Sequence, residues 1–344
     1  MQNFENIKIK AVGSVITEWM EKPNLNQMTL KGTGFKFIDN ELQGLRPSQF
    51  IVLGGRPGTG KTTFLINLIN ELNSSLDKDE CVLFISLEQT ASEITQKLFS
   101  MNTFYELKNF YESLNIVEDL KAFNKMGFDR VIENSKCYFV DDPDIRAEHI
   151  KNLIVFFAQR TQKKVRAVFI DHIQILSTAK HFSSKYEQTS YISRILKKLA
   201  LDTSIPVVAL SQMSRDWAAT QQRKPKATKK ANEKGQQPTQ VEKLKATPPI
   251  LTDLRDSGSI EQDADIVLFL YERDIEENKE RNDYSMINLS IAKNRNGCIG
   301  KEQEIVFIQP LALMIELTQE NQAWIVSAFK NLEKQRKERE NGKQ

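Results

Sequence analysis

Eight consecutive residues near the start of the chain, 55–62, read G-R-P-G-T-G-K-T and match the pattern G-x-x-x-x-G-K-[ST]. A short apolar run precedes them and a helical period follows, which is the context that this pattern requires. Glycines let successive N–H groups point at phosphate oxygens, and the helix N-terminus adds partial positive charge. The pattern predicts an ATP phosphate site in which Lys61 reaches the β- and γ-phosphates and Thr62 ligates Mg²⁺. The predicted loop residues are Gly55, Arg56, Pro57, Gly58, Thr59, Gly60, Lys61, Thr62 and Thr63.

Two carboxylates further along the chain could complete such a site. Asp171 ends the apolar run 168–170 and is a candidate to hold the metal's water shell. Hydrolysis also needs a group that orients or deprotonates the attacking water, and Glu88, at the end of F-I-S-L-E, is the best candidate. Read alone, each could be an ordinary carboxylate at a strand end or a helix start. The upstream phosphate loop favours the chemical interpretation.

The elements that must position these residues alternate along the chain. Short apolar runs are separated by amphipathic helical stretches such as 64–72 and 192–199. Strand, helix and strand repeated in this way predict an α/β fold with a mostly parallel central sheet flanked by helices. The predicted strands contain residues 50–53, 81–85, 137–140, 168–170, 207–210, 266–270 and 287–291.

Composition excludes several classes of protein. With 344 residues, 40% hydrophobic and 27% charged, the chain resembles an ordinary folded domain. No apolar run approaches the roughly 18 residues of a membrane span, and the start lacks the apolar core of a secretory signal. Three cysteines are too few and too scattered for a disulfide framework or a zinc site. We therefore expect a cytoplasmic protein with no membrane partner.

The net charge of +3 is unevenly distributed. Residues 216–249 hold eight basic and three acidic side chains, and residues 330–344 hold six and three, so the remainder is acidic. Basic appendages on an acidic body favour a polyanionic partner, and a solvated linker is the alternative. The composition of 216–249 predicts a long loop. The last fifteen residues lack a continuous apolar stripe, which predicts a frayed helix or disorder.

Further motifs occur in order and carry a family resemblance. They are G-T-G-F from residue 32, L-Q-G-L at 42–45, S-L-E at 86–88, I-D-H-I-Q-I-L at 170–176, P-V-V-A-L-S-Q-M-S-R at 206–215, L-R-D-S-G-S-I-E-Q-D-A-D at 254–265 and A-K-N-R-N-G at 292–297. From about Gly32 to about Leu317, the chain resembles the C-terminal motor domain of the DnaB-family replicative DNA helicases. The resemblance implies a RecA-like P-loop NTPase fold in a homo-hexamer, with ATP and Mg²⁺ between subunits and single-stranded DNA in the central channel.

The resemblance also implies roles for single residues at the nucleotide. Lys61 and Thr62 match the phosphate-loop pair, Glu88 matches the catalytic glutamate, and Asp171 matches the aspartate that holds Mg²⁺ through water. Gln212 matches the glutamine that senses the γ-phosphate and relays the nucleotide state to the DNA loops.

Other matched residues would act on a neighbouring subunit or on DNA. Lys293 and Arg295 match the basic pair that enters the neighbour's site, with Arg295 as the arginine finger. Without the family, this pair reads as solvated strand-end residues. A further set would hold the DNA backbone without reading bases, with an aspartate where the family usually has glutamate. That set is Arg215, Arg255, Asp256 and Gly258.

The chain also departs from the family pattern. Only about thirty residues stand where the family carries an N-terminal collar domain, so we expect 1–31 to be a linker whose helix, with Ile16, Trp19 and Met20, docks on an adjacent subunit. We expect the motor domain at 32–317 and a charged tail at 318–344. Residues 310–317 fit the family's closing strand poorly, and His172 stands where an aromatic residue is more usual.

These features predict an ATP-hydrolysing DNA helicase or single-strand translocase, with a primase or helicase loader as a further partner. The rival hypothesis is a nucleotide-switched loader or adaptor that binds DNA without unwinding it, which the short N-terminal region favours. A recombination ATPase is disfavoured because no cysteine-rich zinc module precedes the phosphate loop. A kinase fits poorly because residues 216–265 resemble a DNA loop.

Overall fold

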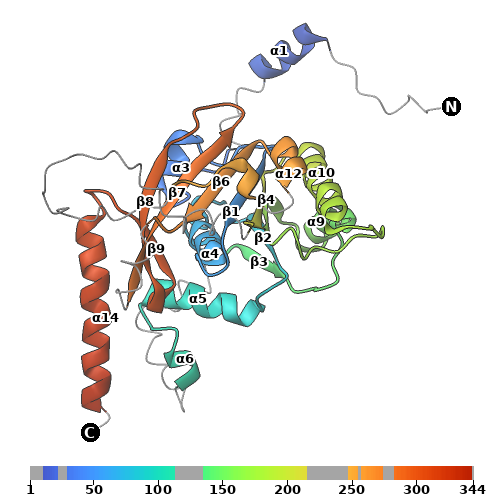
Figure 1. The fold of residues 1–344 in the computed structure, drawn as a ribbon. Coiled ribbons are helices and arrows are strands. Elements are labelled where there is room, and N and C mark those ends of the chain that lie inside the picture. Colours follow the sequence, from blue (N-terminus) through green and yellow to red (C-terminus); the bar gives the residue numbers. More distant parts are fainter. Residues whose placement is uncertain are drawn as a thin grey trace, which may run out of the picture.

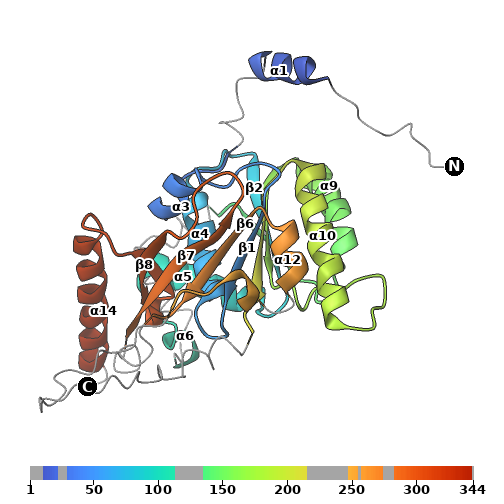
Figure 2. The same ribbon diagram turned by 45° about the horizontal axis from the view of Figure 1, so that its top comes forward.

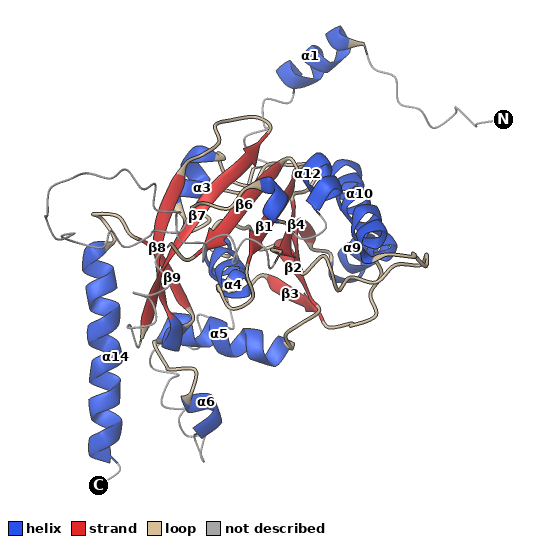
Figure 3. Ribbon diagram, in the orientation of Figure 1, coloured by secondary structure: helices blue, strands red, loops and turns tan. Residues whose placement is uncertain are grey.

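The fold is an α/β domain built on one nine-stranded sheet, seen here in a computed structural model (Figures 1 and 3). The structure describes residues 11–21, 29–112, 135–214, 247–254, 257–273 and 283–342. The strand order is β3-β2-β4-β5-β1-β6-β7-β8-β9. The strands are β1 Phe50–Gly55, β2 Glu80–Ser86, β3 Cys137–Val140, β4 Lys164–Asp171, β5 Val207–Gln212, β6 Ile266–Tyr271, β7 Tyr284–Asn294, β8 Glu302–Ile308 and β9 Leu313–Glu316.

The first six strands in that order are parallel, and β7, β8 and β9 continue the sheet antiparallel. The mostly parallel α/β fold expected from the alternating pattern is therefore confirmed. Every residue of β1, β2 and β6 is buried, as continuous apolar runs predict for strands covered on both faces.

Two apolar cores lie on the two faces of the sheet. Side chains alternate along each strand, so that Ile51 and Leu53 join one core while Phe50 and Val52 join the other. The first core contains α4 and α5, and the second contains α9, α10 and α12, which Figure 2 shows on opposite sides. These helices are α4 Lys61–Leu72, α5 Ala91–Thr103, α9 Ile150–Thr161, α10 Lys185–Thr203 and α12 Ser257–Asp263.

The remaining helices are short or terminal. The helix expected in the N-terminal region is present as α1, which stands apart from the sheet in both views (Figures 1 and 2). The other elements are α1 Val12–Glu21, α3 Lys36–Glu41, α6 Asn109–Glu112, α14 Gln322–Gly342 and the 3-10 turns Ala147–His149, Leu251–Asp253 and Gln309–Leu311. Among the described helices, none is long and apolar enough to cross a membrane.

The antiparallel end of the sheet corrects one expectation. Within 310–317, residues 313–316 do form the closing strand, because a 3-10 turn with Pro310 at its start redirects the chain and β9 then pairs with β8. Asn67 on α4 locks this strand in place: its amide donates to Ala312 O at 2.9 Å and accepts from Met314 N at 3.0 Å. A proline at the turn, outside the pairing, leaves the ladder intact.

The C-terminal segment corrects a second expectation. Residues 322–342 form α14, which lies beside the β8–β9 edge in Figures 1 and 2. Ile325, Ala328 and Leu332 are buried against the first core. Arg336 donates to Glu106 and to Asp283, at 2.8 Å to the nearest oxygen of each. For the last fifteen residues we predicted a frayed helix or disorder, and the structure shows a helix as far as Gly342, held by Leu332 and Arg336, so the alternative of disorder was wrong.

Candidate active site

The phosphate loop leaves the carboxyl end of β1 and enters α4, as its pattern predicts. Gly58 and Gly60 have φ of 83° and 84°, a left-handed backbone that favours glycine. A Cβ at Gly60 would also meet Met314 Cε at 2.5 Å, so β9 packs directly behind the loop. The first N–H groups of α4 directly follow the loop and lack intrahelical acceptors, as in any helix. The loop is therefore shaped for an anion.

Lys61 begins α4 beside the carboxylates of the neighbouring strands. Its Nζ donates to Arg56 O at 2.8 Å, within the loop itself. Burial lowers the pKa of the Lys61 ammonium, and the charges of Asp171 and Glu88 oppose that shift. A charged phosphate oxygen is a stronger hydrogen-bond acceptor than a carbonyl oxygen. A bound phosphate would therefore compete with Arg56 O for the Lys61 ammonium.

Thr62 and Asp171 meet although 109 positions separate them. Thr62 Oγ1 donates to Asp171 Oδ2 at 2.6 Å. Asp171 ends β4 and is 1% exposed. It pairs with Ser86 on the neighbouring strand β2. A hydroxyl and a carboxylate form the hard oxygen donor set that Mg²⁺ prefers. The residues present therefore fit that ion.

Glu88 follows β2 and reaches the same region. Leu87 N donates to Asp171 O at 2.9 Å, which ties the segment after β2 to the end of β4. The Glu88 side chain is 55% exposed, whereas Asp171 beside it is buried. The Asp171 carboxylate is thus buried against the Thr62 hydroxyl, while the Glu88 carboxylate remains accessible to solvent.

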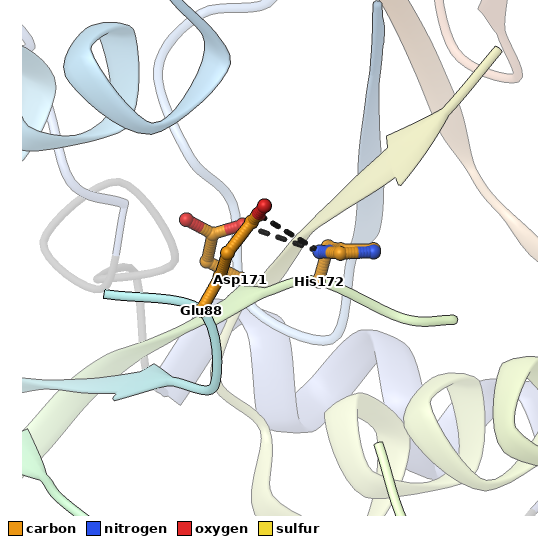
Figure 4. A group of neighbouring side chains, drawn as sticks. All are labelled: Glu88, Asp171 and His172. Carbon is orange, nitrogen blue, oxygen red and sulfur yellow. Dashed lines mark ion pairs between the residues drawn. The ribbon is translucent and has the colours of Figure 1, made fainter. Parts of the chain in front are cut away.

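His172 lies between Glu88 and the end of β5. Its Nδ1 is 3.4 Å from Glu88 Oε2 and 3.7 Å from Asp171 Oδ1. Figure 4 marks both contacts with dashed lines. Its Nε2 is 3.1 Å from Gln212 Nε2. Gln212 pairs with Gly55 across β5 and β1, so it stands beside the start of the phosphate loop. The structure brings together Lys61, Thr62, Glu88, Asp171 and Gln212, all predicted from the sequence.

Lys293 and Arg295 lie at the opposite edge of the sheet. Arg295 N donates to Asp265 O just before β6, whereas the phosphate loop leaves β1 level with Leu270. The five residues between these levels span about 16 Å, more than an arginine side chain can reach. The Arg295 guanidinium is 3.3 Å from Asp265 Oδ1, and Lys293 Nζ donates to Ala264 O at 2.6 Å. Neither cation serves its own phosphate loop.

Most of the predicted DNA contacts lie outside the described residues. Arg215, Arg255 and Asp256 belong to that group, as does most of the insertion at 216–249. Gly258 is described and lies in the first turn of α12 rather than in a loop. A Cβ there would meet the hydroxyl of Tyr186 at 3.0 Å.

Two side chains near the carboxylates were absent from the predicted set. Lys97 on α5 donates to Gln89 Oε1 at 2.7 Å, and burial lowers its pKa against the charges of Asp171, Glu93 and Glu88. Its i,i+4 spacing from Glu93, on the helix that follows Glu88, was the available signal. Gln174 donates to Ser211 Oγ at 2.8 Å and accepts from Gln212 N at 3.3 Å, a contact that no sequence spacing indicates.

The sequence profile of the DnaB-like helicase C-terminal domain matches residues 32–231 and 234–314. This chain belongs to that family. It is 31% identical to the replicative DNA helicase DnaB of Mycoplasma genitalium over 82% of this chain and 56% of that protein. It is also 31% identical to DnaB of Geobacillus stearothermophilus, over 91% of this chain and 62% of that one. The chain thus spans little more than half the length of the curated relatives it matches.

Solved structures of the DnaB-like family share the fold. An ATPase domain is 26% identical, with a TM-score of 0.69, and matches 90% of this chain and all of its own. A DnaB-like replicative helicase, studied with its primase interactions, gives the same TM-score and identity over 68% of its length. The expected RecA-like fold and the expected family are both confirmed.

Proposed function

We propose that this chain is an ATP-hydrolysing motor that moves along single-stranded DNA and opens duplex DNA during replication. The observation that supports the proposal is that the predicted site residues lie at two opposite edges of the sheet. The phosphate loop, the two carboxylates and Gln212 lie at the carboxyl edge, while Lys293 and Arg295 lie at the amino edge. Head-to-tail copies would bring the two halves together, and such interfaces form a ring when the rotation between copies closes.

At the carboxyl edge, the chain's own groups suit phosphoryl transfer to water. Lys61 and the N–H groups of the loop would bind the phosphates, and Glu88 would orient the attacking water by accepting its proton. Gln212, beside Gly55, would contact the γ-phosphate. Thr62 and Asp171 would hold Mg²⁺, the latter through water, and the ion when bound would neutralise charge on the phosphates.

The amino edge would serve the neighbouring copy. Arg295 leaves its contact with Asp265 and places its guanidinium on the transferring phosphoryl group, with Lys293 beside it. Such a group delivered in trans contributes about 10³–10⁵-fold to turnover in related phosphoryl transfers. Hydrolysis then depends on the interface, which is how a homo-hexameric ring would couple turnover to movement.

DNA would occupy the centre of that ring. Arg215, Arg255, Asp256 and Gly258 would hold the phosphate backbone, and the basic insertion at 216–249 would add charge close by. The DnaB-like replicative helicase with a known structure interacts with primase. We propose a primase or a helicase loader as a partner of this chain too.

The test is ATP hydrolysis by the purified chain with and without single-stranded DNA. We expect strong stimulation by DNA that is lost in both Lys61→Ala and Arg295→Ala. Mixing the two inactive variants restores activity, because an intact loop from one meets an intact arginine from the other at about a quarter of randomly mixed interfaces. A mixture as inactive as its components contradicts a shared site.

A strand-displacement assay on a forked duplex then separates two activities. Unwinding that requires ATP supports the helicase. Hydrolysis stimulated by DNA without displacement supports the nucleotide-switched loader or adaptor. Turnover indifferent to DNA contradicts the helicase and favours the loader or adaptor.

A further inference from the structure

Three strand ends meet at one histidine in the active site. We propose that His172 is a positioning residue that couples the Gln212 amide to the Glu88 carboxylate through its two ring nitrogens. The inference rests on the proposed function, which assigns Gln212 to the γ-phosphate and Glu88 to the attacking water. It adds a link between these two groups, so that the position of one controls the orientation of the other.

The hydrogen-bond pattern fixes which nitrogen does what. The Gln212 amide nitrogen lies 3.1 Å from His172 Nε2, and an amide N–H can only donate, so Nε2 accepts. With the Gln212 amide in this orientation, the remaining ring N–H is the one on Nδ1. That nitrogen faces Glu88 Oε2 at 3.4 Å, with Asp171 Oδ1 at 3.7 Å (Figure 4). One ring thus lies between the Gln212 amide on one side and the Glu88 carboxylate on the other.

The backbone around the ring is held in place, so movement must pass through side chains. Ile173 N donates to Leu210 O at 3.0 Å, which fixes the chain directly after His172 to β5. Gln174 contacts both Ser211 and the backbone of Gln212. The His172 side chain is 4% exposed, whereas that of Glu88 is 55% exposed. The ring is anchored, and the Glu88 carboxylate is the free end that it orients.

This arrangement has a chemical consequence. When the Gln212 amide turns toward a γ-phosphate, it withdraws its N–H from Nε2, and the ring loses one of its two restraints. The position of Nδ1 beside the Glu88 carboxylate then changes with the nucleotide state. A phenyl ring at the same place fills the space but transmits nothing, because it offers neither a donor nor an acceptor.

Three substitutions separate the two contacts. His172→Phe removes both; His172→Asn keeps a donor near the place of Nδ1; His172→Gln keeps a polar group near the place of Nε2. For each, kcat, KM, affinity for ADP and the ratio of hydrolysis with and without single-stranded DNA are measured. An exposed histidine, His149, gives the matched control His149→Phe.

We expect His172→Phe to lower kcat about tenfold, because the Glu88 carboxylate loses the polar ring nitrogen beside it, with KM and ADP affinity almost unchanged. Its ratio of hydrolysis with and without DNA falls toward one. In His172→Asn, kcat falls less than in His172→Phe, but the ratio of hydrolysis with and without DNA falls by the same amount. In His172→Gln, the ratio of hydrolysis with and without DNA stays higher than in His172→Asn. Its kcat falls further than that of His172→Asn.

A phenylalanine variant with the wild-type kcat and ratio overturns the inference. So does an equal loss of kcat and ratio in the asparagine and glutamine variants, because packing alone would produce it. If the phenylalanine variant unfolds, those two polar variants still decide the matter. Wild-type hydrolysis that ignores DNA refutes the proposed function instead, before any His172 variant is made.

Discussion

The C-terminal helix offers a sharp test of what holds this fold together. Arg336 on α14 makes four hydrogen bonds to two carboxylates, Glu106 after α5 and Asp283 before β7, between 2.8 and 3.2 Å. The Glu106 side chain is only 3% exposed, whereas those of Arg336 and Asp283 are both 32% exposed. One guanidinium thus ties the last helix to two distant segments.

The magnitude follows from these exposures. We expect Arg336→Met, which keeps the aliphatic length, to leave Glu106 buried with only its contact to Lys108, at a cost of about 2 kcal/mol. The more exposed pair with Asp283 adds about 0.5–1 kcal/mol after solvent screening. The free energy of unfolding therefore falls by about 3 kcal/mol, or roughly 5 °C in Tm. Urea unfolding followed by circular dichroism measures it.

The matched control lies on the same helix. Lys334 and Glu338 form an exposed i,i+4 pair at 3.7 Å, with side chains 73% and 64% exposed. Lys334→Met removes one cation from α14, as Arg336→Met does, and should cost about 0.3–0.5 kcal/mol. Equal losses of stability in the two variants would refute the reasoning.

Acid provides a second check on the same cluster. Burial opposes ionisation of Glu106, but hydrogen bonds from Arg336 and Lys108 outweigh it and hold its pKa below the ordinary 4.5. The hydrogen bonds from Arg336 likewise hold the pKa of Asp283 below 3.8. Because folding lowers both pKa values, the stabilisation is complete above the ordinary pKa values of the unfolded chain. It is lost as the pH falls through the lower pKa values of the folded protein. The difference between wild type and Arg336→Met should therefore shrink below about pH 4, and a difference independent of pH would contradict the assignment.

Three further substitutions test the frame behind the phosphate loop. Asn67→Ala removes one hydrogen bond within α4, to Thr63 O, and two that join α4 to Ala312 and Met314 at β9, and should cost about 2–3 kcal/mol in urea unfolding. Glu316 accepts from the N–H groups of Lys36 and Phe37 at 2.9 and 2.8 Å, so Glu316→Gln, which turns an acceptor into a donor, should cost about 1–2 kcal/mol by the same measurement. Gly60→Ala meets both a positive φ and β9, so calorimetry should detect no ATP binding, and retained affinity would show that the loop can shift.

Local patterns proved reliable where one segment carries its own signal. The phosphate loop could be predicted because its glycines, Lys61 and Thr62 lie within eight consecutive residues. Buried parallel strands could be predicted because they are continuous apolar runs. The seven predicted strands all appear. β8 and β9 were missed because E-Q-E-I-V-F-I is apolar only at one end, and β9 is four residues long. Short edge strands form because a neighbour is available, which no local pattern records.

The sequence by itself determined the family, the phosphate loop and the identity of the residues that gather around it. Tertiary structure alone decided which of them meet. Asp171 and Thr62 come into contact because parallel strands end at the same edge of the sheet, while β7 runs antiparallel and carries Arg295 to the opposite edge. The double role of His172 and the hold of Arg336 on α14 depend in the same way on distant neighbours. A hydrogen bond is fixed by positions in space, and the fold sets those positions by packing segments that the chain keeps far apart.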